Sequence, residues 1–260
     1  MFEVIAFDGD DTLWHNEAVF AMTHERFRAL VGPYAGGASA GASAELDDRL
    51  FATEMSNLKL FGYGVKAFML SMIETAIAVS AGRVPVEVIE KIIESGKEML
   101  THPVELLDGV RETVETLAAR AGGAGGPGGA GGAGGAGGAG GLRLMLITKG
   151  DLFHQESKLA ASGLAEHFWR VAVVAEKTPA VYRRVLRDHA VDPATFLMVG
   201  DSVRSDILPV AEIGGSAVHI PFHLTWAYEV APQVTNHPRV WNLERIDELP
   251  RLLDKIDGPG

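Results

Sequence analysis

Hydrophobic and polar positions divide the chain into two kinds of pattern. Short apolar runs alternate with segments of helical periodicity around residues 1–14 and 105–260, whereas residues 15–104 show helical periodicity alone. The apolar runs predict strands at 4–7, 142–147, 171–175, 196–199 and 217–220, with a further short one at 239–241. Strands separated by helices predict an α/β fold, a doubly wound, Rossmann-like parallel sheet with helices on both faces.

Four consecutive helices with no strand between them predict a separate helical domain. Their apolar faces lie within residues 15–31, 46–58, 68–77 and 85–99. We therefore expect an inserted four-helix domain over residues 15–104 and a sheet domain made of residues 1–14 and 105–260. Further helices are expected at 107–117, 152–162, 179–189, 205–213 and 245–256.

A tract of glycine and alanine runs from residue 121 to 141 within the sheet domain. It has no apolar periodicity and no aromatic residue, so it cannot pack a core and is expected to be a flexible insertion. A glycine-rich loop that binds phosphate is short and leads into a helix, whereas this tract leads into a strand. The tract is therefore interpreted as an inert linker.

Composition narrows the function classes. The chain has 260 residues, 47% of them hydrophobic, a net charge of −11 and no cysteine. Disulfides, thiolate catalysis and cysteine-ligated zinc are excluded, and the acidic balance argues against a nucleic-acid partner but leaves small anionic substrates open. The most apolar helical stretch, 65–79, is too short and too polar to span a bilayer, and no signal peptide is visible, so no membrane partner and a cytoplasmic location are expected.

Polar side chains follow four of the predicted strands at the point where each strand ends. Since parallel strands deliver their C-terminal ends to one edge of a doubly wound sheet, these side chains are expected to converge there. They are Asp8 and Asp10 after the first strand, Thr148 and Lys149 after the second, Lys177 after the third, and Asp201 and Asp206 after the fourth.

This set resembles the four sequence motifs of the haloacid dehalogenase superfamily. Asp8-Gly9-Asp10-Asp11-Thr12 is similar to the first motif, Thr148 to the second, Lys177 to the third, and Gly200-Asp201 with Asp206 to the fourth. The helical insertion between the first two motifs resembles the all-helical C1-type cap of the phosphatase branch. The motifs are specific for the superfamily but only weakly specific for the substrate.

The resemblance implies a magnesium-dependent phosphatase with an aspartyl-phosphate intermediate. Asp8 would be the nucleophile, and a hard divalent cation, Mg²⁺, would offset the repulsion between two anions. The metal ligands implied are Asp8, Asp201 and the backbone carbonyl of Asp10. Thr148 would orient a phosphoryl oxygen, and Lys177 would supply fixed positive charge. Asp206 would not contact the substrate but would order Lys177 or metal-bound water. Alternatively, it is a carboxylate that the helix dipole stabilises at the N-terminus of its helix.

Asp10 separates the reaction classes within the superfamily. An alkoxide leaving group needs a proton, so a second acid suits ester hydrolysis, with Asp10 as general acid and then general base. Relatives that cleave carbon–halogen bonds lack this acid, because halide needs no proton. A 2-haloacid dehalogenase and a phosphomutase remain alternatives on the same fold, and a catalytically silent binding protein is the alternative outside enzymes.

Substrate choice is expected to lie in the helical domain. The five-residue spacing from Asp201 to Asp206 resembles branches that act on small phosphorylated metabolites, nucleotide monophosphates or sugar phosphates. The aromatic candidates could instead pack the helices together, and the lysine candidates could be ordinary solvated surface charges. The candidate contacts are His15, Asn57, Lys59, Phe61, Tyr63, Lys66 and Lys149. The sequence leaves the oligomeric state open.

Overall fold

The computed structural model describes residues 1–35, 42–120 and 141–257, which form two compact units. The first unit, the sheet unit, contains 1–15, 104–148 and 155–260. The second, the helical unit, contains 16–103 together with the short segment 149–154. The sequence predicts that segment to be part of the sheet domain, whereas in the structure it groups with the helices of residues 16–103. The flexible insertion predicted at 121–141 lies, apart from Gly141, outside the described residues.

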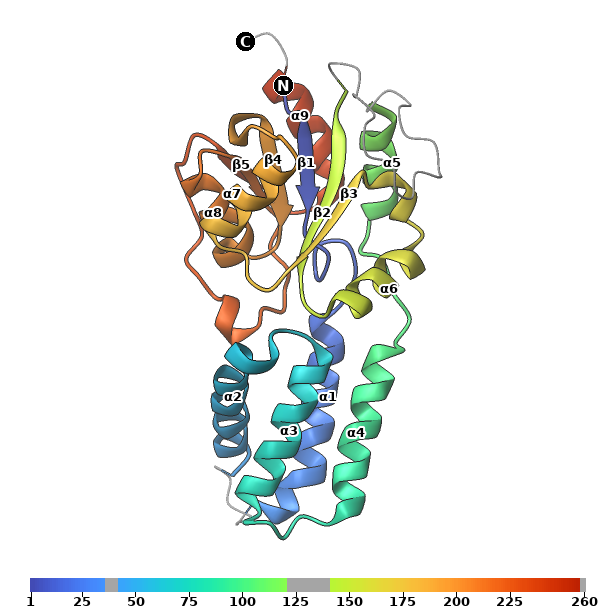
Figure 1. The fold of residues 1–260 in the computed structure, drawn as a ribbon, viewed down its shortest axis with the longest axis vertical. Helices are drawn as coiled ribbons and strands as arrows, with labels where there is room; N and C mark the ends of the chain where they lie inside the picture. Colours follow the sequence, from blue (N-terminus) through green and yellow to red (C-terminus); the bar gives the residue numbers. More distant parts are fainter. Residues whose placement is uncertain (36–41, 121–140, 258–260) are drawn as a thin grey trace. The chain divides into compact units, whose positions relative to one another are not determined.

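A six-stranded sheet in the order β3-β2-β1-β4-β5-β6 forms the centre of the sheet unit (Figure 1). Its pairs β1–β2, β1–β4, β4–β5 and β5–β6 are parallel, which confirms the predicted α/β fold. The strand order reverses at β1, whose neighbours are β2 on one side and β4 on the other. The strands are β1 (Val4–Phe7), β2 (Arg143–Lys149), β3 (Arg170–Val174), β4 (Phe196–Gly200), β5 (Ser216–His219) and β6 (Val240–Asn242).

The central strand β1 is apolar throughout because both faces of the sheet are covered by helices. Its alternate residues enter two separate cores. Ile5 and Phe7 pack with residues of α5, α6 and α9, whereas Val4 and Ala6 pack with residues of α7 and α8. The helices that supply these residues are α5 (Val110–Arg120), α6 (Leu152–Ser162), α7 (Pro179–Asp188), α8 (Leu208–Glu212) and α9 (Leu249–Asp257).

The helical unit has a hydrophobic core of its own. Phe27 of α1, Leu50 of α2, Met72 of α3 and Ile92 of α4 are all at most 1% exposed and belong to one cluster. The described helices are α1 (Glu17–Val31), α2 (Ala42–Phe61), α3 (Val65–Val79) and α4 (Val86–Leu100). The chain therefore contains the inserted helical domain that its periodicity predicts.

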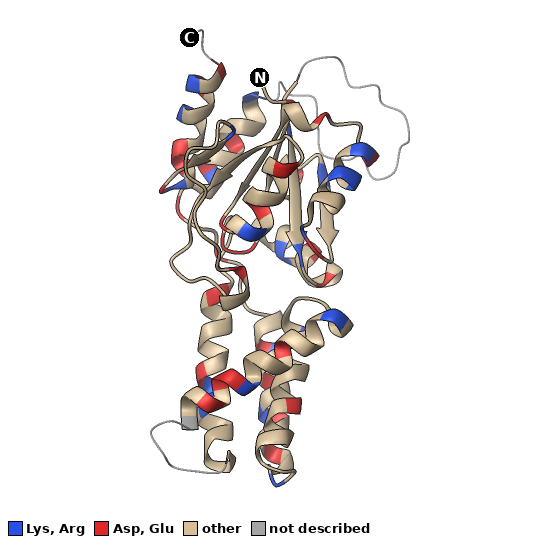
Figure 2. Ribbon diagram, turned by 90° about the vertical axis from the view of Figure 1, so that its left-hand side faces the viewer, with Lys and Arg blue, Asp and Glu red and all other residues tan. Residues whose placement is uncertain are grey.

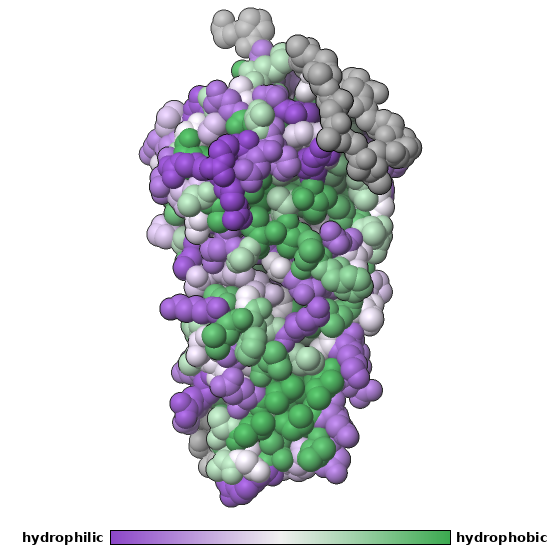
Figure 3. All heavy atoms as spheres, in the orientation of Figure 1, coloured by the Kyte–Doolittle hydropathy of each residue, from purple (hydrophilic) through white to green (hydrophobic). Residues whose placement is uncertain are grey.

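Some large apolar side chains of the helical unit remain exposed, including Leu70 and Ile77 of α3 and Val86 of α4. Figure 3 shows apolar residues gathered on the helices of this unit. Lysines and arginines are dispersed among acidic residues in both units (Figure 2). Within the described parts of the chain, no helix combines the length and apolarity needed to cross a bilayer.

Candidate functional site

The candidate site forms where the strand order reverses, at the C-terminal ends of β1 and β4. Ligands of open α/β sheets bind at such a position because the loops from the two strands diverge there. The Thr12 side chain joins the two loops. Its hydroxyl oxygen accepts a hydrogen bond from the backbone N–H of Asp201 at 3.1 Å and lies 3.3 Å from Oδ1 of the Asp201 side chain.

A buried lysine connects two of the predicted acids. Nζ of Lys177 lies 2.5 Å from Oδ1 of Asp8 and 2.6 Å from Oδ1 of Asp206, and the Lys177 side chain is only 1% exposed. Asp206 is fully buried, and its Oδ2 accepts a hydrogen bond from the backbone N–H of Ser202. Burial disfavours the ammonium, but the two carboxylates outweigh burial and raise the pKa of Lys177 above its usual range. Lys177 is therefore a fixed positive charge beside Asp8.

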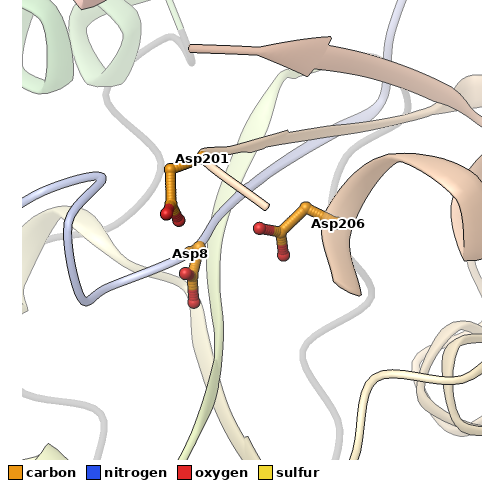
Figure 4. A group of neighbouring side chains, drawn as sticks. All are labelled: Asp8, Asp201 and Asp206. Carbon is orange, nitrogen blue, oxygen red and sulfur yellow. The ribbon is translucent and has the colours of Figure 1, made fainter. Parts of the chain in front are cut away.

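Three carboxylates gather at this edge of the sheet. Figure 4 shows the side chains of Asp8, Asp201 and Asp206 gathered close together, and one oxygen from each lies within 4.8 Å of the other two. Burial raises the pKa of Asp8 to about 7, with Lys177 opposing and Asp206 adding to the shift. Burial and repulsion from Asp8 and Asp206 raise the pKa of Asp201 well above its usual range.

The donor set of this acidic cluster fits a hard divalent cation. Its ligand atoms are carboxylate oxygens, which magnesium and calcium prefer over nitrogen or sulfur. Asp206 already uses Oδ1 on Lys177 and Oδ2 on the Ser202 amide, so Asp8 and Asp201 are the better placed to coordinate. Burial, together with repulsion between the carboxylates, raises the pKa values of Asp8 and Asp201, and a bound cation would stabilise their ionised forms.

Thr148 lies next to the loop that follows β1. It belongs to the C-terminal end of β2, and its side chain is 1% exposed. A Cβ placed on Gly9 would be 3.3 Å from Oγ1 of Thr148 and 2.8 Å from the ring of Trp14. Only glycine fits between these two side chains, so the turn after β1 lies directly against Thr148.

Asp10 faces a different group of residues from Asp8. Its Oδ1 accepts hydrogen bonds from Nε1 of Trp14 at 2.7 Å and from Nζ of Lys158 at 2.8 Å. Its Oδ2 accepts one from Nε2 of Gln155 at 2.9 Å. Burial favours the neutral acid, but the charge of Lys158 and these hydrogen bonds outweigh burial and lower the pKa of Asp10. Lys158 and the two other donors therefore stabilise the ionised form of Asp10.

The close approach of Gly200 and Asp206 gives a first prediction. A Cβ at Gly200 would overlap the Asp206 carboxyl group and lie 2.7 Å from the Cβ of Asp206. We expect Gly200→Ala to displace Asp206 from Lys177, lowering turnover at least tenfold and the free energy of unfolding by about 1–3 kcal/mol. Gly32→Ala is the matched control, because a Cβ there meets nothing within 4 Å. Equal turnover and equal unfolding midpoints in the two variants would contradict this prediction.

The predicted substrate contacts have varied surroundings. His15 belongs to the sheet unit, where its ring packs edge-on against Phe222. Asn57 is buried in the helical unit and donates to Oγ of Ser71 and to a carboxylate oxygen of Glu74, so its amide joins α2 to α3. A substrate role for either residue stays a prediction.

The remaining predicted contacts all belong to the helical unit. Lys59 is exposed. Nζ of Lys149 lies 4.2 Å from the ring centre of Tyr63, which is a cation–π contact. Lys66 pairs with Asp151 at 2.9 Å. The segment 149–154 thus contacts the turn before α3, and a role in substrate binding remains a prediction for these residues too.

Other contacts at the site have no counterpart in the sequence analysis. A carboxylate oxygen of Glu229 accepts hydrogen bonds from the hydroxyls of Ser202 and Ser205, at 2.5 and 2.7 Å. Nε2 of His219 donates to the backbone carbonyl of Asp201 at 2.9 Å. Glu229 follows β5 in a segment without periodicity, so no local signal indicates this contact. The hydrogen bonds of Glu229 and His219 stabilise the turn that contains Asp201 and Asp206.

The partners of Asp10 were also missed. Trp14 is fully buried and reads as an ordinary core residue, and Gln155 and Lys158 lie about 145 positions from Asp10 in the sequence. The sequence does indicate that Gln155 and Lys158 lie side by side, because they are three residues apart on a predicted helix and therefore share one face.

The chain is similar to known hydrolases in sequence and in fold. The family model for haloacid dehalogenase-like hydrolases matches residues 2–214. A haloacid dehalogenase-like hydrolase from Xanthomonas campestris is 36% identical, with 98% of this chain and 92% of that chain covered and a TM-score of 0.80. No curated protein matches the chain.

More distant solved structures share the fold. One is a predicted phosphoglycolate phosphatase from Haemophilus somnus, with 17% identity, 97% and 98% of the two chains covered, and a TM-score of 0.59. Another is a 2-haloacid dehalogenase from Pseudomonas syringae, with 20% identity, 98% and 100% covered, and a TM-score of 0.59. A third is a putative β-phosphoglucomutase from Thermotoga maritima, with 14% identity, 98% and 99% covered, and a TM-score of 0.57. The reaction type differs among these three.

Proposed function

The chain belongs to the haloacid dehalogenase-like hydrolases, and within this family we propose that it is a magnesium-dependent phosphatase acting on a small phosphorylated metabolite. Asp8 is the nucleophile, Lys177 and Thr148 position the phosphoryl group, and Asp10 is the general acid and base. Asp8, Asp201 and the backbone carbonyl of Asp10 would hold the cation. When bound, the cation would neutralise the carboxylates and polarise a phosphoryl oxygen.

Asp8 begins the reaction by attacking phosphorus. A bond forms between a carboxylate oxygen of Asp8 and phosphorus, while the bond from phosphorus to the leaving oxygen breaks. Asp10 has to take up a proton before this step, and it gives that proton to the leaving oxygen, so an alcohol leaves. Water then attacks phosphorus and gives a proton back to Asp10, and the bond to Asp8 breaks. Lys177 stays charged throughout, because its pKa lies above the usual range.

The contacts of Asp10 are the observation that favours a phosphatase over a dehalogenase. Halide leaves without a proton, so halide displacement has no use for a second acid beside the nucleophile. In this chain Asp10 accepts hydrogen bonds from three separate side chains, and a largely buried lysine is among them. Burying a lysine costs free energy unless its partner is well placed, so this arrangement supports a working role for Asp10.

Release of inorganic phosphate is the experiment that tests the proposal. The purified chain is incubated with a panel of sugar phosphates and nucleoside monophosphates, with Mg²⁺ or with EDTA, and chloride release from 2-chloropropionate is measured in parallel. We expect phosphate from a few members of the panel, none in EDTA and no chloride. Chloride release without phosphate would make the chain a dehalogenase, and isomerised sugar phosphate without free phosphate would make it a mutase.

Several expectations from the sequence are part of this proposal. The helical unit acts as the cap that selects the substrate, a sugar phosphate or a nucleotide monophosphate. Nucleic acids and membranes are not partners, and the enzyme is cytoplasmic. The phosphate-release panel tests whether the substrate is a sugar phosphate or a nucleotide monophosphate.

A further inference from the structure

We propose that Trp14, Gln155 and Lys158 form a positioning group that fixes the direction of the Asp10 carboxylate for proton transfer. The inference rests on the proposed phosphatase function and adds residues outside the four motifs. Gln155 and Lys158 lie on α6, and Trp14 ends the turn that follows β1. All three side chains belong to the sheet unit, as does Asp10.

The burial of the three donors distinguishes them from ordinary surface residues. Trp14 is 0% exposed, Gln155 3% and Lys158 9%. Lysine and glutamine are usually exposed, and a lysine taken out of water needs a charged partner. Lys158 has that partner in Asp10, at 2.8 Å. Gln155 and Lys158 are one helical turn apart, so α6 presents both to the loop after β1.

The turn after β1 places the third donor. The backbone N–H of Asp11 donates to the carbonyl of Trp14 at 2.8 Å, and Asp11 adopts a left-handed φ of 59°, which aspartate tolerates better than most residues. The ring of Trp14 lies against Gly9, where no Cβ would fit. The indole cannot move without disturbing the loop that follows β1, so its N–H donates to Asp10 from a fixed position.

The hydrogen bonds are distributed unequally over the two oxygens of Asp10. Oδ1 accepts two, from Trp14 and Lys158, which use both of its in-plane lone pairs. Oδ2 accepts one among the described residues, from Gln155. The remaining lone pair of Oδ2 can therefore carry a proton while all three hydrogen bonds stay in place. The geometry assigns Oδ2 as the oxygen that exchanges a proton with the leaving group and with water.

The test compares variants that remove one donor each. Lys158→Met and Gln155→Leu each keep side-chain volume close to that of the native residue. Steady-state turnover is measured on an alkyl phosphate from the active panel and on p-nitrophenyl phosphate, whose leaving group needs little protonation. Lys158→Arg retains the charge and the donor, and Lys255→Met removes an exposed lysine from α9 as the matched control.

We expect kcat on the alkyl phosphate to fall about tenfold or more in Lys158→Met and Gln155→Leu, with KM changed less than about threefold. On p-nitrophenyl phosphate the first step should survive, giving a burst of one nitrophenolate per site before slow turnover. Lys158→Arg should recover most of the loss, and Lys255→Met should match the native protein. Equal losses on both substrates without a burst, or no loss at all, would overturn the positioning role.

Crystal structures of the variants separate this inference from the proposed function. The Asp10 carboxylate should rotate in Lys158→Met and Gln155→Leu but not in Lys255→Met. An unchanged Asp10 would overturn the inference whatever the enzyme hydrolyses. A rotated Asp10 in a chain whose native form releases no phosphate would instead leave the positioning group standing and refute the phosphatase.

Discussion

The Asp8→Asn variant is expected to lose turnover by at least about a thousandfold while remaining folded. Asparagine has nearly the same volume but no charged oxygen to attack phosphorus, and loss of a nucleophile removes most of an enzyme's rate enhancement. The stability should change little, because the substitution removes an ion pair with Lys177 and also a repulsion with Asp201. Phosphate release and thermal unfolding of the same preparation measure the two effects.

Asp11→Asn is the matched control for this variant. It makes the same chemical change three residues away, at a left-handed position that asparagine also tolerates. Its turnover is expected to stay within about threefold of the native value. Substantial turnover by Asp8→Asn would show that Asp8 is not the nucleophile. A ligand-binding activity that survives the change intact would favour the catalytically silent alternative.

Lys177→Met is expected to give the largest loss of stability. It leaves Asp206, which is fully buried, and Asp8 without the cation that lies within 2.6 Å of both. Removing one partner of a buried ion pair typically costs about 3–5 kcal/mol, and we expect a loss of free energy of unfolding in that range at neutral pH. Turnover should fall as well, because the fixed charge beside Asp8 is gone. Chemical denaturation in EDTA measures the loss without compensation from a bound metal.

The loss in Lys177→Met should depend on pH in a defined direction. Lys177 lowers the pKa of Asp8, so without Lys177 that pKa lies further above its unfolded value near 3.8 and the folded state binds more protons than the unfolded state. Stability relative to the native protein should therefore fall as pH rises above about 7, where Asp8 of the native protein ionises and Asp8 of the variant does not. Lys177→Arg should show a smaller loss of stability than Lys177→Met, and Lys255→Met should show no such loss. A loss that is independent of pH would contradict this account of Lys177.

The sheet and its chemistry could be predicted from the sequence because the pattern is local. Buried parallel strands are continuous apolar runs, and the run 4–7 corresponds to β1 without change. Parallel strands also deliver their C-terminal ends to one edge, so the convergence of Asp8, Lys177, Asp201 and Asp206 followed from topology alone.

Element boundaries were less predictable because hydrogen bonding, and not hydropathy, decides them. The strand expected at 142–147 is β2 (Arg143–Lys149), so Thr148 lies on the strand itself. The helix expected at 205–213 begins as a π-helical turn at Val203–Ile207 and continues as α8. Proline at 209 lacks an N–H and is accommodated in the first turn of α8.

The surroundings of Asp10 and of the fourth motif required the three-dimensional structure. Lys158 is separated from Asp10 by 148 positions, and Glu229 from Ser202 by 27, so neither contact leaves a local pattern. A buried lysine and an exposed one also have the same signature on an amphipathic helix. Only the packing of α6 against the loop after β1 distinguishes Lys158 from the other lysines of the chain.

The central claim is that phosphorus becomes bonded to Asp8 during turnover. The most direct measurement mixes the enzyme and Mg²⁺ with a ³²P-labelled substrate from the active panel, quenches in acid within one turnover and identifies the labelled peptide by mass spectrometry. We predict one acid-stable, base-labile label on Asp8, absent from Asp8→Asn. Phosphate release by the native enzyme with no labelled peptide, or with the label on another residue, would contradict the account.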